Sequence, residues 1–490
     1  MASRLGVFKE SLASAVAILV SRVLGLVREV LTASFFGADK YTDAFFLAWK
    51  IPNVFRRVLG EGAFNPVMQP LLAEDSDGSF RGSLLFYTAL VSLAVALGLW
   101  ALAPLLINFL SPSGDREFIQ TATTFLRYLA FYVFFASLNA YFMGLLQFDG
   151  GSLRRFFSYL SQAVFNLTVV GFVLFYHSLL GIWSLVYGTL LGGLLQVLTI
   201  WGFAKYTNTK VGFSFSFSPK VGEFFKNLVP NLGSLGIGQI STVAEAFFST
   251  HAGVGVLSNL YYAYRLFQLP ASLVGVAVAN TVLSKMARNS SSSKGESWDY
   301  LLRGVEIGLL LSVPAFLGLF ILAFPIVEVI YKHGVFENQD AQKVALFIQL
   351  YSLGLVPYVL YRVLLNKLFT KKSYRRAFFY SLVWFFVEVF LSAVGIFIFH
   401  LGGWVIALSS SLAVWLTLFL FLLRERVLSL VWDAFWKLKY IVPLWVLMVF
   451  YLLVLEHFLG NPYLVVFVAI ATVGVPYLVF LKRIFIFREL

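Results

Sequence analysis

Charged side chains interrupt two long apolar segments near the N-terminus and one in the middle of the chain. An Arg or Lys at the centre of a bilayer costs about 2.5–3.5 kcal/mol on insertion scales, so such residues face water, one another or a ligand. The set has six cations and three anions, which leaves an excess of positive charge. The cations are Arg22, Arg28, Lys50, Arg56, Arg57 and Arg265, and the anions are Glu29, Asp43 and Glu61.

The spacing of these charges predicts a shared helical face. Asp43, Lys50 and Arg57 recur every seven residues, and Glu61 follows Arg57 by four. The planar guanidinium fork of Arg suits phosphate oxygens better than the point charge of Lys does. The mostly Arg surplus therefore predicts a cavity for an anionic substrate that carries a pyrophosphate or a phosphate monoester. The alternative is a set of internal ion pairs that only joins helices.

The composition identifies the elements that must position these residues. The chain has 490 residues, of which 60% are hydrophobic and only 12% are charged. Soluble globular proteins are roughly half apolar and about a quarter charged, so a soluble globular chain is excluded. A membrane-spanning helix needs about 20 apolar residues. The apolar segments predict an all-α polytopic membrane protein with fourteen membrane-spanning helices.

The distribution of positive charge predicts the orientation in the membrane. With fourteen spans both termini lie on one side, and alternate loops then hold nearly all the loop cations. Only four cations fall in the other loops: Lys40, Arg116, Lys332 and Lys343. Because cation-rich loops stay in the cytoplasm, both termini are expected there. The net charge of +13 then reflects topology, and no nucleic-acid partner is expected.

Two weak internal matches predict a repeat. Ser152-Leu-Arg-Arg recurs as Ser373-Tyr-Arg-Arg, and an aromatic stretch that ends at Pro52 has a counterpart that ends at Pro270, at nearly the same offset. These matches predict two six-helix lobes in a pseudo-two-fold arrangement, over residues 1–216 and 217–424. Paired bundles of this kind bind substrate at the repeat interface and alternate its access to the two sides.

The C-terminal part is expected to lie outside the repeat. Residues 425–439 have apolar positions at helical spacing and are predicted to lie flat on the cytoplasmic surface. A plain linker is the alternative there. Residues 440–490 hold helices 13 and 14, whose nearly uncharged faces predict a groove for a lipid tail. A plain scaffold is the alternative for these two helices.

The energy source is expected to be an ion gradient or the membrane potential. The sequence has no P-loop motif for a nucleotide, and Glu245 and Glu388 lie deep in the second half. Carboxylates beside Ser and Thr hydroxyls could bind Na⁺ or carry H⁺. The alternative is that each Glu is protonated, or paired with a base such as Arg362. No metal site is indicated firmly, because the five histidines lack the spacing of a helical zinc site.

Two other function classes remain as alternatives. A polytopic polyprenyl-phosphate glycosyltransferase would need acidic metal ligands at the membrane surface, and the only short acid-rich loop is Glu74–Asp77. A drug/cation antiporter would favour an acidic cavity, whereas this charge set is net basic. Neither alternative fits as well as a transporter of an anionic substrate, so the chain is expected not to be an enzyme.

Several segments resemble one family closely. These are SRVLGLVRE from Ser21, TDAFFLAWKIPN from Thr42, FRRVLGEGAF from Phe55, and YYAYRLFQLP from Tyr261 with Gly275-Val-Ala. They resemble the MurJ lipid II flippases of the MOP (multidrug/oligosaccharidyl-lipid/polysaccharide) exporter superfamily. The resemblance covers nearly the whole chain and implies a V-shaped pair of six-helix lobes. It also implies translocation of lipid II, the undecaprenyl-pyrophosphate-linked peptidoglycan precursor, from the cytoplasmic to the periplasmic leaflet. Another MOP-type exporter is the alternative.

The resemblance also assigns residues to the cavity. The family's cavity arginines map onto Arg22, Arg28, Arg56 and Arg265, and we expect support from Ser21, Asp43, Lys50, Asn53 and Arg57. Two positions depart from the family pattern, since Tyr264 and Gln268 stand where acids are common. Membrane lipids and the cell-wall synthesis machinery are the expected partners, with the chain itself a monomer.

Overall fold

The computed structural model describes residues 2–58, 64–75, 78–112, 114–288 and 294–481. Over these residues every regular element is a helix and none is a strand, which confirms the all-α prediction. The chain divides into two compact units, Met1–Ser258 and Asn259–Leu490. This division follows the packing of residues within each unit. The lobe boundaries at residues 216 and 424 follow from the sequence repeat instead, and they stay a prediction.

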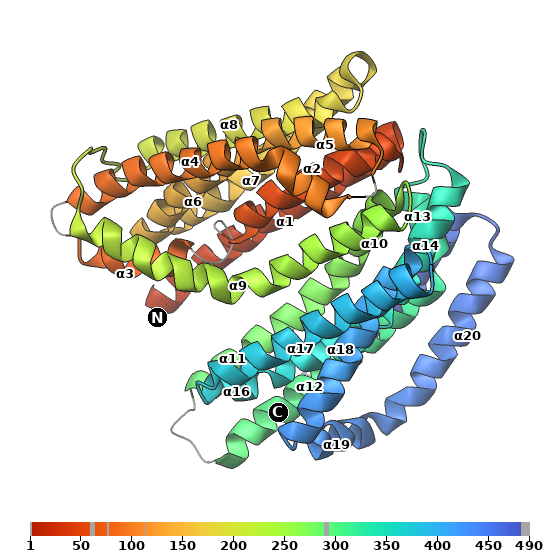
Figure 1. Ribbon diagram of the computed structural model, residues 1–490. Coiled ribbons are helices and arrows are strands. Elements are labelled where there is room, and N and C mark those ends of the chain that lie inside the picture. The colour runs from red at the N-terminus through yellow and green to blue at the C-terminus, as the bar shows by residue number, and fades with distance from the viewer. Residues whose placement is uncertain (1, 59–63, 76–77, 113, 289–293, 482–490) are drawn as a thin grey trace. The chain divides into compact units, whose positions relative to one another are not determined.

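The first unit is a bundle of long helices. In it α1 runs beside α7, α7 packs on α8, and α2 contacts α5, α6 and α9 (Figure 1). Its helices are α1 (Ala2–Phe36), α2 (Lys40–Val58), α3 (Phe64–Ala73), α4 (Ser79–Leu110), α5 (Arg116–Leu129), α6 (Tyr132–Asp149), α7 (Ser152–Leu180), α8 (Trp183–Tyr206), α9 (Pro219–His251) and the first residues of α10 (Val256–Pro270).

Local sequence explains where several of these helices begin and end. The Asp115 side chain accepts a hydrogen bond from the Phe118 backbone N–H at 2.6 Å and so caps the start of α5. Pro219 occupies the first turn of α9, where its missing N–H costs nothing. The turn between α7 and α8 holds Gly181 at a φ of +52°, in the left-handed region that favours glycine.

The second unit is also helical and has several broken helices. α10 passes into a π-helical turn (Ala271–Val276) directly after Pro270. The helices that follow are α11 (Ala277–Arg288), α12 (Lys294–Ile321), α13 (Ala323–Ile330), α14 (Asn338–Ser352), α15 (Leu355–Leu364), α16 (Asn366–Thr370), α17 (Tyr374–Ala393), α18 (Trp404–Arg424), α19 (Leu428–Leu438), α20 (Val442–Phe458) and α21 (Pro462–Ala469).

The helices fit a membrane protein. Among the described residues, eleven segments are long and apolar enough to cross a bilayer. α2 is not one of them, because Lys40, Asp43, Lys50, Arg56 and Arg57 fall within its 19 residues. The number fourteen therefore stays a prediction.

The C-terminal elements form helices where the sequence predicts them. α19 buries Leu430, Ala434 and Leu438 in the core of the second unit and exposes Trp432 and Trp436. α20 and α21 share a smaller cluster with Leu322. The placement of α19 on the membrane surface stays a prediction.

Candidate functional site

A polar network joins α1 to α7 around Arg28. The Arg28 guanidinium donates to Glu29 at 2.6 Å and to the Asn166 side-chain oxygen at 3.1 Å. The Asn166 amide in turn donates to the Ser21 carbonyl at 3.0 Å. The Arg28 guanidinium also lies 5.7 Å from the Phe165 ring centre, over its face. Two predicted binding residues, Ser21 and Arg28, are thus brought together by an Asn of α7.

A second ion pair joins α2 to α9. The Lys50 ammonium lies 3.0 Å from the Glu245 carboxylate, and the two side chains are only 12% and 14% exposed. On the next turns of α2, the Arg56 Nε–H donates to the Asn53 side-chain oxygen at 3.0 Å. Lys50 and Glu245 belonged to two different predicted sites, one for substrate and one for a coupling ion, and here they are partners.

Asp43 is fully engaged at the start of α10. Its carboxylate accepts hydrogen bonds from the Gly255 N–H at 2.6 Å and from the Ser258 N–H and hydroxyl at 2.8 and 2.6 Å. An anion at the N-terminus of a helix satisfies backbone N–H groups that have no partner within the helix. Asp43 is 5% exposed, so its role in the structure is that of a capping residue.

The turn that presents these donors fits closely against the turn between α1 and α2. Gly255 has a φ of +78°, and an added Cβ would lie 2.5 Å from the Ala38 carbonyl oxygen. Any other residue would be strained here by the backbone conformation and by the clash. The Asp43 cap therefore depends on a glycine.

The remaining predicted binding residues have different surroundings. Arg22 is exposed on α1, next to the buried Ser21, whereas Arg56 and Arg57 are half-buried near the end of α2. In the second unit, the half-buried Arg265 donates to the Tyr261 hydroxyl at 2.9 Å, one turn earlier in α10. Glu61 lies outside the described residues.

Of the two expected ion-coupling carboxylates, Glu245 belongs to the first unit and Glu388 to the second. Glu388 is half-buried on α17. Ser411 of α18 donates to the Leu350 carbonyl at 2.6 Å, and the buried Nε atom of Arg362 has no hydrogen-bond partner. Over the described part of the chain, no three acidic, His or Cys residues cluster as a metal site would require. Ion coupling at Glu245 and Glu388 stays a prediction.

Sequence reasoning missed two residues of these networks. Asn166 is a buried polar residue in an otherwise apolar segment of α7, and that pattern alone could have marked it. Ser258 follows Gly253 and Gly255 at the start of an apolar helix, which is typical of a helix N-terminus. Neither pattern says which distant carboxylate or guanidinium the residue meets.

Comparisons with known proteins point to one family. The family model described as lipid II flippase MurJ matches residues 32–474. A probable lipid II flippase MurJ from Aquifex aeolicus is 31% identical over 402 residues, which cover 81% of this chain and 79% of the relative. A probable lipid II flippase MurJ from Buchnera aphidicola (subspecies Acyrthosiphon pisum) is 29% identical and covers 90% and 89%.

Solved structures share the fold. A structure of lipid II flippase MurJ in an inward closed conformation superposes with a TM-score of 0.82 at 24% identity, over 96% of this chain and 98% of that one. An inward-facing MATE multidrug transporter of the MOP superfamily gives a TM-score of 0.64 at 15% identity, over 84% and 95%. At these identities the likeness concerns the fold alone.

Proposed function

Since the chain belongs to the MurJ family of lipid II flippases, we propose that it moves lipid II from the cytoplasmic to the periplasmic leaflet of a bacterial inner membrane. The members of this family are transporters, so the chain is a transporter and not an enzyme. The observation that carries the proposal is the concentration of cations on α1 and α2, helices that otherwise hold apolar membrane-type sequence.

Lipid II carries a pyrophosphate, and arginine is the side chain best suited to it. Arg22 is exposed beside Ser21, and Arg28 is held in place by Glu29 and Asn166. A guanidinium that is already oriented loses less side-chain entropy when it binds an anion. We assign the pyrophosphate to Arg22, Arg28, Arg56 and Arg265, which would be exposed in turn to the two faces of the membrane.

The observed pairings refine the supporting roles. Asp43 and Lys50 are engaged with the α9–α10 turn and with Glu245, so they act by positioning α2. Asn53 orients Arg56 through the hydrogen bond to its Nε–H. We propose that these three residues shape the site and that the arginines contact the substrate.

The lipid tail and the energy source complete the proposal. The nearly uncharged residues 440–481 include α20 and α21, and we assign them to the polyprenyl tail. The membrane potential or a Na⁺ or H⁺ gradient supplies the drive, since moving one charge across 100 mV is worth about 2.3 kcal/mol.

Complementation of a flippase-depleted bacterium tests the assignment. Removing one Arg from a pyrophosphate clamp should cost a charge-assisted hydrogen bond, about 1.5–3 kcal/mol. We expect Arg22→Ala, Arg28→Ala, Arg56→Ala and Arg265→Ala to lower growth rescue at equal membrane abundance. Arg127→Ala is the matched control, because this membrane-segment arginine lies over the Trp100 ring instead. Full rescue by all four variants would overturn the assignment.

A further inference from the structure

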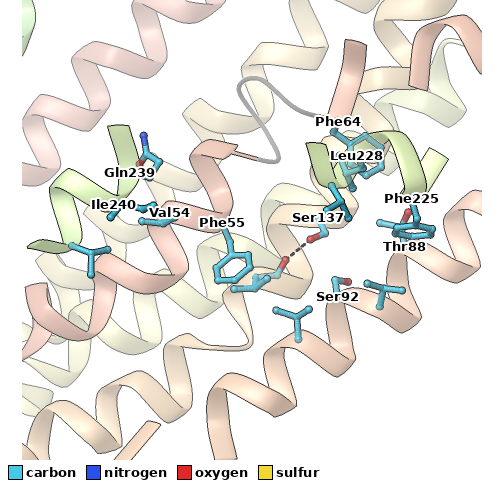
Figure 2. Close-up of a pocket in the computed structure, with 15 residues that line it drawn as sticks. Val54, Phe55, Phe64, Thr88, Ser92, Ser137, Phe225, Leu228, Gln239 and Ile240 are labelled. Atoms are coloured by element: carbon cyan, nitrogen blue, oxygen red, sulfur yellow. Dashed lines mark hydrogen bonds between the residues drawn. The ribbon is translucent and has the colours of Figure 1, made fainter. Parts of the chain in front are cut away.

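The first unit contains a cavity that the proposed transport site does not use. It has a volume of about 460 Å³ and lies among α2, α3, α4, α6 and α9. Figure 2 shows its lining side chains, with Gln239 and Ile240 at one end and Phe225 and Thr88 at the other. The described lining includes no charged residue, and its main contributors are apolar side chains such as Val54, Phe55, Val133 and Phe225.

Two of the four polar side chains that line the cavity, Ser92 and Ser137, already have hydrogen-bond partners. The Ser92 hydroxyl donates to the Ala89 carbonyl at 3.2 Å, and the Ser137 hydroxyl donates to the Val133 carbonyl at 2.8 Å. A buried water needs two to four polar partners, and a lining with so few polar groups offers water little stabilisation. An empty cavity would leave its lining atoms without contacts on one side. A hydrocarbon occupant therefore suits the lining best.

The other two polar side chains lie at opposite ends of the cavity, and Thr88 marks one of these ends. Thr88 is 4% exposed, and its hydroxyl has no hydrogen-bond partner. A buried hydroxyl without a partner is costly, so an acceptor on the occupant would be stabilising. The Gln239 side-chain oxygen at the opposite end also has no partner, and this occupant does not explain it.

The bilayer itself is the nearest source of such an occupant. Val91, Val229 and Ile240 contribute to the cavity and are 42%, 66% and 53% exposed, so the lining continues onto the outer surface of the unit. On α4 this surface includes the exposed side chains Leu90 and Leu97. α4 is apolar enough to span a membrane, and lipid chains surround such a surface.

We propose that the cavity binds one acyl chain of a membrane phospholipid, with the chain's ester carbonyl accepting a hydrogen bond from the Thr88 hydroxyl. α4 has 32 residues and is about 48 Å long, so it extends beyond a hydrocarbon core of about 30 Å. Thr88 is its tenth residue, about 14 Å from its start, and so lies about 5 Å inside a core centred on the helix, where an ester group near the interface can reach it. A polyprenyl phosphate fits less well, because its hydrocarbon begins at a phosphate and the described lining has no cation to pair with it.

Photolabelling of the whole protein in vesicles tests the proposal. The probe is a phosphatidylcholine with a diazirine in the middle of one acyl chain, diluted into phosphatidylethanolamine and phosphatidylglycerol. Labelling of the exposed face of α4 is expected from any surrounding lipid. Labelling of Val133 or Ser137 on α6, which are 1% and 3% exposed, is expected only if a chain enters the cavity. Labelling of α4 without labelling of α6 would overturn the proposal.

Variants separate the cavity from the outer surface. Ser92→Leu and Ser137→Leu fill the cavity and should abolish labelling of α6, whereas Leu97→Phe on the exposed face of α4 should leave it unchanged. Thr88→Val keeps the shape, removes the hydroxyl and should reduce labelling of α6. Unchanged α6 labelling in all three cavity variants, or its displacement by undecaprenyl phosphate, would contradict an acyl-chain site.

Discussion

The Lys50 ammonium and the Glu245 carboxylate lie 3.0 Å apart and join α2 to α9 within the first compact unit. Both side chains are shielded, so water screens the attraction between them less than at an exposed surface, and loss of either partner would leave a shielded charge unpaired. A cation that bound the Glu245 carboxylate would have to displace the Lys50 ammonium or share the carboxylate with it. Binding of an ion at Glu245 would therefore be linked to the position of α2.

A double-mutant cycle at this pair measures the coupling. We expect Lys50→Ala and Glu245→Gln each to lower the free energy of unfolding, because each leaves a shielded charge without its partner. The double variant should be less destabilised than the sum of the single variants, with a coupling of about 0.5–3 kcal/mol. Thermal unfolding in one detergent provides the measurement. Additive single effects would show that the two charges are not coupled.

The Asp43 cap predicts a local effect at the α9–α10 turn. Asp43→Ala removes the acceptor of three hydrogen bonds, and we expect a loss of about 1–3 kcal/mol in the free energy of unfolding. Ser258→Ala removes one donor and should cost less. Hydrogen exchange should rise at the Gly255 and Ser258 amides in Asp43→Ala. Wild-type protection of both amides in this variant would contradict the capping role.

Gly255 provides a matched pair with Gly150. Both have positive φ angles, +78° and +68°, but a Cβ at Gly150 meets nothing within 4 Å, whereas one at Gly255 meets the Ala38 carbonyl oxygen. We expect Gly150→Ala to cost about 1–3 kcal/mol from the backbone conformation alone, because its φ of +68° and ψ of −173° are adopted almost only by glycine. Gly255→Ala should cost clearly more, as measured by the melting temperature. Equal costs would show that the turn relaxes without strain.

Acid should weaken a surface cluster that joins the starts of α2 and α5. Lys40 and Tyr41 donate to Glu117 at 2.5 and 2.7 Å. The hydrogen bond from Lys40 holds the pKa of Glu117 below its usual value. The stabilisation is then fully present above the unfolded-state pKa of Glu, about 4.3, and is lost as the pH falls through the lower folded-state pKa.

Glu117→Gln tests this pH dependence. We expect the variant to melt below the wild type near neutral pH, and the gap to close below about pH 4 as Glu117 becomes protonated in the wild type. Glu337→Gln, at an exposed acid directly before α14, is the control for a general change of charge. A gap that stays constant or widens on acidification would contradict the assignment.

Much of the fold follows from the sequence, because a bilayer admits few structures. Apolar segments of membrane-spanning length predict helices, since in lipid every backbone group must be paired internally. α4, with 32 residues and no acid, and the 20-residue segment Pro462–Leu481, which α21 opens, are of this kind. The short helix over 428–438 also follows from its apolar spacing.

The pairing of the charges could not be predicted from the sequence. Helical periodicity places Asp43 and Lys50 on one stripe of α2, yet one meets a backbone turn and the other a carboxylate. Which groups meet depends on the rotation and bending of two helices far apart in the sequence. Helix breaks, such as those at Ala130–Phe131 and after Pro270, rotate the residues that follow relative to those before. No local sequence pattern sets the size of that rotation.

Transport of a fluorescent lipid II across vesicles that hold the purified protein tests the central proposal most directly. The wild-type protein should translocate the lipid faster than it crosses protein-free vesicles, and Arg127→Ala should match the wild type. The rate should fall to that of protein-free vesicles, in a protein that stays folded, in the variant that combines Arg22→Ala, Arg28→Ala, Arg56→Ala and Arg265→Ala. Translocation by the combined variant at the wild-type rate, or none by the wild type under an imposed membrane potential and Na⁺ and H⁺ gradients, would contradict it.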